Sequence, residues 1–88
     1  MREISFSIPA KHHTLLNRLV EAGVEEVELC RAPEWHVLYP QVRDAYPATA
    51  HRQIQQLGTE LLKITKALGL DVQGVCIQAT QKRFLCYH

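Results

Sequence analysis

The chain of 88 residues lacks most of the features that reveal a function at first reading. No apolar run approaches the roughly 20 residues that a membrane-spanning helix needs. The N-terminal residues alternate between polar and apolar types, unlike the continuous apolar centre of a signal peptide. We therefore expect a cytoplasmic protein that does not bind a membrane.

The chain also has few cysteines, few glycines and a low net charge. The three cysteines, Cys30, Cys76 and Cys86, are too few for a disulfide framework and favour reduced thiols. The four glycines are scattered, so no glycine-rich loop is present to hold a phosphate group. The net charge of +1 provides no strong field for nucleic acid or anionic lipid.

Ligands for a metal are present in number but not in a useful spacing. No CxxC, HxxxH or HExxH motif occurs, and the adjacent His12 and His13 point about 100° apart on a helix. Cys86 and His88 share one face of a strand, which permits a chelate. A metal-responsive protein that uses this pair is therefore a third and weaker hypothesis. A catalytic pair of Cys30 and His36 would depend on their arrangement in space. We expect neither a metal nor a cofactor.

What the chain does contain is the composition of an ordinary globular protein. Hydrophobic residues make up 47% and charged residues 22%. The length predicts one small domain over residues 1–88. A chain this short buries only about 60% of its unfolded surface, so oligomerisation would cover apolar area that the monomer leaves exposed.

The first third of the chain predicts a strand, a helix and a second strand. Apolar and polar residues alternate over 2–8, and an apolar stripe predicts a helix over 10–22. Gly23 stands where a helix commonly ends, and alternation resumes over 24–30. The short joints favour a βαβ unit.

The last half predicts a long helix and a hairpin. The helix covers 49–68, with Thr49 as its N-cap and Gly69 just after its end. Its apolar residues recur at spacings of three and four: Ile54, Leu57, Leu61, Ile64 and Leu68. The hairpin covers 72–88.

A two-residue turn at Gln81-Lys82 would pair Ile77 with Cys86 and Val75 with His88. Cys86 would then lie in the core and Cys76 on the opposite face of the sheet. A slip of one residue would instead bring the two thiols together, and the sequence leaves this register open.

Between these halves lies a connection, residues 31–48, that prolines interrupt. A short strand over Trp35–Tyr39 is one possibility within it. It holds half of the six aromatic residues, and long ordered connections are often functional. Trp, Tyr and Arg dominate the energetics of protein interfaces. We therefore expect partner-binding anchors here: Trp35, Tyr39, Arg43 and Tyr46.

These elements predict an α+β fold in the order β-α-β-(β)-α-β-β. It would be a two-layer sandwich, one four- or five-stranded sheet with two helices on one face. The other face would carry polar residues, namely Ser5, Ser7, Glu26, Glu28 and Gln78.

The order is similar to that of Alba-type chromatin proteins and of the TusA sulfur-carrier family. The likeness lies in element order alone. The Cys-x-x-Pro motif of TusA-like proteins is absent near Pro9, and the chain is not basic like Alba-type proteins. If a strand forms at 35–39, the chain would instead resemble the ferredoxin-like fold with one extra C-terminal strand. Proteins of that shape often dimerise through the sheet.

The leading hypothesis is a non-enzymatic interaction or regulatory module, a homodimer that binds a protein partner through the connection 31–48. The alternative is a small nucleic-acid-binding domain that uses Arg31, Lys82 and Arg83, because arginine near aromatic residues can stack on bases.

Overall fold

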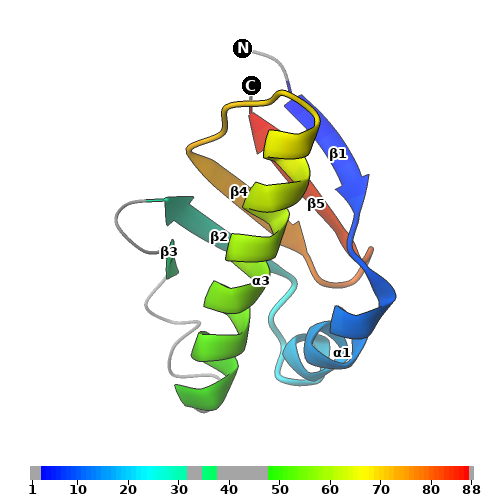
Figure 1. Cartoon of the computed structure of the whole chain (residues 1–88). Coiled ribbons are helices and arrows are strands. Elements are labelled where there is room, and N and C mark those ends of the chain that lie inside the picture. Colours follow the sequence, from blue (N-terminus) through cyan, green and yellow to red (C-terminus); the bar gives the residue numbers. More distant parts are fainter. Residues whose placement is uncertain (1–2, 32–34, 38–47, 88) are drawn as a thin grey trace.

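A computed structural model describes residues 3–31, 35–37 and 48–87. Its elements follow one another along the chain as in Figure 1: β1 (Glu3–Ser7), η1 (Ala10–His12), α1 (His13–Glu21), β2 (Glu26–Arg31), β3 (Trp35–Val37), α3 (Ala48–Ala67), β4 (Gly74–Gln78) and β5 (Arg83–Tyr87).

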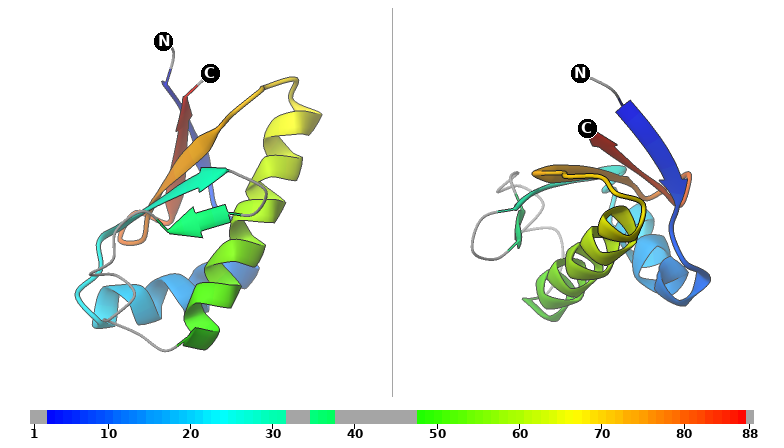
Figure 2. Two further views of the ribbon diagram at one scale, coloured as in Figure 1. Left: turned by 90° about the vertical axis from the view of Figure 1, so that its left-hand side faces the viewer. Right: turned by 45° about the horizontal axis from the view of Figure 1, so that its top comes forward.

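One five-stranded sheet has the order β1-β5-β4-β2-β3, and each pair of neighbouring strands is antiparallel. Helices α1 and α3 both lie against the same face of the sheet, as the right-hand view of Figure 2 shows. The predicted two-layer α+β sandwich is therefore confirmed, and a strand is present at 35–37.

The core lies between the sheet and the two helices. Alternate residues of β2, β4 and β5 point into it, and Ile54, Leu57 and Leu61 of the predicted helical stripe cover them. The last member of that stripe was predicted wrongly, because Leu68 lies outside α3 and is 57% exposed. A buried aliphatic or aromatic side chain stabilises the fold by about 1.5–3 kcal/mol. The largest fully buried side chains include Phe84, Leu16, Leu19, Leu29, Ile54, Leu57, Leu61 and Ile77.

Both helices end just before the glycines that were expected to follow their C-termini. Gly23 and Gly69 have φ values of 86° and 78°, in the left-handed region that glycine adopts without strain. After α3, the Leu70 N–H donates to the Thr65 carbonyl at 3.0 Å and the Gly69 N–H to the Lys66 carbonyl at 3.0 Å. These paired bonds form a Schellman motif, and α1 ends in the same way.

Two local predictions were wrong. The strands of a βαβ unit run parallel, but β1 and β2 are antiparallel and are separated by β5 and β4. The chain therefore forms neither that unit nor a ferredoxin-like arrangement built on it. The predicted cap residue Thr49 lies inside α3, which already begins at Ala48.

The predicted hairpin register was wrong by two positions. Val75 pairs with Cys86 and Ile77 with Phe84, so four residues form the turn. Ala79 is buried, and its N–H donates to the Glu25 carbonyl at 2.9 Å, which draws it out of the hairpin ladder. Because the shift is even, each side chain keeps its predicted face.

Candidate functional site

The face of the sheet away from the helices is the first candidate site, since neither helix covers it. The register aligns its side chains in rows across β1, β5, β4 and β2. One row is Ser7, Arg83, Gln78 and Glu26, and the next is Ser5, Leu85, Cys76 and Glu28. We call the side of these four strands that points away from the helices the open face.

Arg83 is held at the β1 side of the open face. Its Nε donates to the Ser5 hydroxyl at 2.9 Å, and its Nη1 donates to the Ser7 hydroxyl at 3.2 Å. The guanidinium charge therefore lies beside β1, whereas Glu26 and Glu28 stand on β2, at the other side of the same face. Glu3 also stands on β1, so the β1 side of the open face carries one charge of each sign and the β2 side is negative.

A hollow of about 200 Å³ lies on the open face around Gly74, with Tyr87, Cys76 and Cys30 at its walls. A Cβ atom at Gly74 would stand 2.9 Å from the Leu29 carbonyl oxygen, so β2 and β4 pair here only because this residue has no side chain. Tyr87 is 49% exposed beside the hollow, which leaves an aromatic surface available to a partner.

Cys76, on the open face, is not an activated nucleophile. Burial, together with the nearby carboxylates of Glu26, Glu28 and Glu3, raises the pKa of Cys76 to about 11. Such a thiol stays protonated near neutral pH, and the protonated form is a weak nucleophile. Burial also raises the pKa of Cys86.

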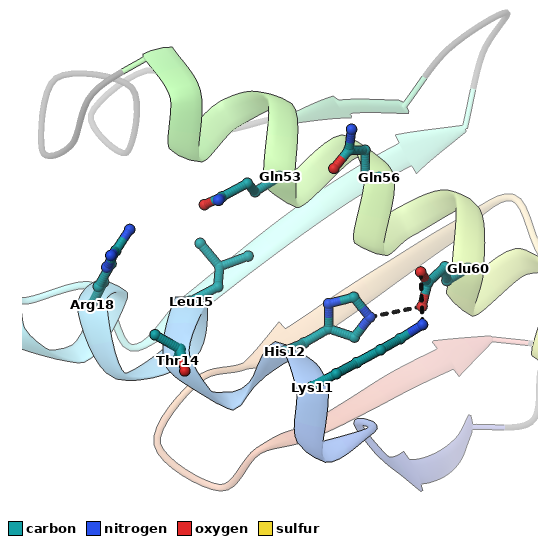
Figure 3. A pocket seen from close by; sticks show the side chains of 8 residues that line it. All are labelled: Lys11, His12, Thr14, Leu15, Arg18, Gln53, Gln56 and Glu60. Atoms are coloured by element: carbon teal, nitrogen blue, oxygen red, sulfur yellow. Dashed lines mark hydrogen bonds and ion pairs between the residues drawn. The ribbon is translucent and has the colours of Figure 1, made fainter.

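A second site is a polar groove between α1 and α3, with a volume of about 280 Å³ (Figure 3). At one end of it, Glu60 of α3 uses both carboxylate oxygens. His12 Nε2 lies 2.7 Å from Oε2, and Lys11 Nζ lies 3.1 Å from Oε1. These two bonds lower the pKa of Glu60, so the carboxylate is ionised.

The rest of this inter-helix groove is lined by uncharged and basic groups. Arg18 stands at the end opposite Glu60, Leu15 lies between them, and Gln53 and Gln56 project from α3 on the other side. Sequence reasoning missed this site because His12 and Glu60 are 48 residues apart. The only local signal was the position of Glu60 directly before the core residue Leu61, which places it next to the buried side of α3.

The structure describes little of the predicted partner-binding segment. Trp35 belongs to β3, where its backbone pairs with Arg31. The other three anchors, Tyr39, Arg43 and Tyr46, lie outside the described residues.

The residues of the nucleic-acid alternative are not brought together. Lys82 and Arg83 stand at the end of the sheet that holds Glu26, whereas Arg31 lies roughly 17 Å further along β2. Strand alternation also places Arg31 on the helix side and Arg83 on the open face. Arg31 therefore contributes nothing to a basic patch around Arg83.

Within residues 3–31, 35–37 and 48–87, no three His, Cys, Asp or Glu side chains come close enough to hold a metal ion. Cys86 is fully buried in the core, and His88 lies outside the described residues. In the same part of the chain, no helix is both long and apolar enough to cross a bilayer.

Comparisons with protein-family models, with curated proteins and with solved structures gave no match. The function must therefore be inferred from the two sites themselves.

Proposed function

We propose that the protein is a non-enzymatic interaction module that acts as a homodimer and binds a protein partner through the connection 31–48. Trp35, Tyr39, Arg43 and Tyr46 are its anchors for that partner. The observation that carries the proposal is the open face, which no helix of the described chain covers. Its centre holds Leu85 and Cys76, with Tyr87 exposed nearby.

The pattern of the open face suits a second copy of the same chain. A two-fold axis parallel to the strands, between β4 and β5, places β5 of one copy over β4 of the other and β1 over β2. Leu85 then meets Cys76, and Tyr87 meets the hollow around Gly74. The two copies make each of these contacts twice.

The charges agree with the same arrangement. Arg83, which lies along β1, would face Glu26 and Glu28 on β2 of the other copy. No glutamate would face a glutamate, since Glu3 on β1 would stand over Cys30. Complementary charge of this kind fixes the orientation of an interface and excludes wrong partners.

A charge exchange tests the dimer. Arg83→Glu places a carboxylate opposite Glu28 of the second copy, and Glu28→Lys places an ammonium opposite Arg83, so each variant alone should be monomeric. An equimolar mixture restores both attractive contacts, and sedimentation velocity should recover a species of twice the 10.1 kDa chain mass. Lys63→Glu, on the exposed surface of α3, is the control and should remain dimeric.

A monomeric wild-type protein at all concentrations would remove the homodimer from the proposal. Dimeric single variants would show that the copies associate through another surface. Circular dichroism on each variant establishes that the fold is retained, because the substituted side chains lie outside the core.

A further inference from the structure

The inter-helix groove has a different character from the open face. Its lining holds two basic side chains, Lys11 and Arg18, and one carboxylate, Glu60, so with His12 neutral the lining has one net positive charge. Glu60 already accepts from Lys11 and His12. Arg18 has no acidic partner among the residues that the structure describes, and seven positions separate it from Lys11, about 10 Å along a helix.

The contact with Glu60 fixes the hydrogen-bonding state of His12. An ionised carboxylate only accepts, so Nε2 of His12 carries the proton that it donates to Glu60. In the neutral ring Nδ1 is then an acceptor, and Figure 3 shows it turned away from Glu60 toward the interior of the groove. The His12 side chain is only 15% exposed, so packing holds the ring in this orientation.

We propose that this groove binds a small metabolite that has an oxyanion at one end and a hydroxyl or amine donor at the other. The Arg18 guanidinium binds the carboxylate or phosphate oxygens, a geometry that suits its planar fork of donors. Gln53 supplies a further amide donor beside it, and Leu15 packs against the ligand's carbon atoms. His12 Nδ1 accepts from the hydroxyl or amine.

The size of the groove limits the ligand. Sites for drug-sized molecules enclose roughly 300–1,000 Å³. At about 280 Å³, just below this range, the groove has room for a ligand smaller than a typical drug-sized molecule. Glu60 is a positioning residue here, since it acts on the ligand only through His12.

The probes are glycerol 3-phosphate, glycerate and glycerol, which share hydroxyl groups and differ in the oxyanion. Titrations followed by two-dimensional ¹H–¹⁵N NMR should show saturable shifts of the Arg18, Gln53 and His12 signals with one or both charged probes and none with glycerol. The probe that binds more tightly identifies phosphate or carboxylate as the preferred group.

Arg18→Gln removes the charge at an exposed position and should weaken binding at least about tenfold, the loss of one charge-assisted contact. Lys63→Gln, an exposed cation of α3 outside the groove, should bind like the wild type. Methyl phosphate lacks the hydroxyls of glycerol 3-phosphate. Glu60→Gln should reduce the difference in affinity between these two probes. No saturable binding of either charged probe, or equal binding by Arg18→Gln and wild type, would overturn the proposal.

Discussion

Gly74 shows how one missing side chain shapes both the packing and the surface of this protein. Its Cα stands opposite Cys30 in the β2–β4 ladder, and a Cβ atom here would lie 2.9 Å from the Leu29 carbonyl oxygen, too close for an ordinary contact. The same absence leaves the hollow on the open face. The sequence presents Gly74 only as a residue near the start of a strand, because close approach to another strand leaves no local pattern.

Cys76, two residues further on, gives a prediction for alkaline pH. In the unfolded chain its thiol titrates near the ordinary pKa of 9.0, whereas in the fold the pKa is about 11. Between these values the unfolded state loses its proton first, so this residue's contribution to stability is present below pH 9 and is lost as pH rises toward 11. We expect Cys76→Ser, which does not titrate, to lose less stability across this window than the wild type.

Urea unfolding at pH 8, 9, 10 and 11 measures this difference. Cys86, whose pKa is also raised, titrates in both proteins and cancels in the comparison. Both proteins carry Tyr87→Phe, because Cys76 contributes to the raised pKa of Tyr87 and that residue would not cancel. Parallel stability curves for the two proteins would contradict the assignment of a raised pKa to Cys76.

At the scale of elements, the end of α3 depends on backbone conformation and not on side-chain packing. Gly69 has φ of 78°, and a Cβ atom there would meet no neighbour within 4 Å. Gly69→Ala should therefore cost about 1–2 kcal/mol of unfolding free energy, solely from the left-handed conformation. Gly69→Asn should cost less, since asparagine tolerates this region.

Urea denaturation of the two variants gives both values. Gly23→Ala provides a matched comparison, because Gly23 has a similar φ and is equally free of neighbours. An alanine variant as stable as the wild type would mean that α3 does not end in a Schellman motif.

The elements that the sequence predicted well are those with local signals. The stripe of α3 and the alternation of β1 and β5 each specify a period and a face within a few residues. The hairpin register failed because the Ala79 N–H bonds to Glu25, more than fifty residues earlier in the chain. The residue types at the turn, Gln81-Lys82, give no indication of that distant acceptor.

At the scale of the whole molecule, the alternation patterns predicted which side chains face the helices but not which strands are neighbours. Short joints around α1 suggested parallel strands, yet α1 carries the chain from one side of the sheet to β2, beyond β5 and β4. The pairing of His12 with Glu60 follows from that path and from the placement of α3. Both sites therefore depend on tertiary arrangement that local sequence does not encode.

The prediction that belongs to the whole molecule concerns the aromatic anchors Trp35 and Tyr39. If they bind a partner, the double variant Trp35→Ala, Tyr39→Ala should remain folded, and its thermal midpoint should shift by no more than the roughly 4–8 °C expected for 1 kcal/mol in a domain of this size. If they fill the core, each loss costs about 3–5 kcal/mol, and the protein unfolds.

Immobilised wild-type protein and the double variant, incubated with extract of the native host, separate these outcomes. Mass spectrometry should identify a protein that the wild type retains and the variant loses, while thermal unfolding confirms an intact fold. Leu68→Ala, a change at an exposed hydrophobic residue outside both the connection 31–48 and the open face, should retain that protein. Unfolding of the double variant would place the two aromatics in the core and exclude them as anchors, because a side chain buried against its own chain presents no surface to a partner.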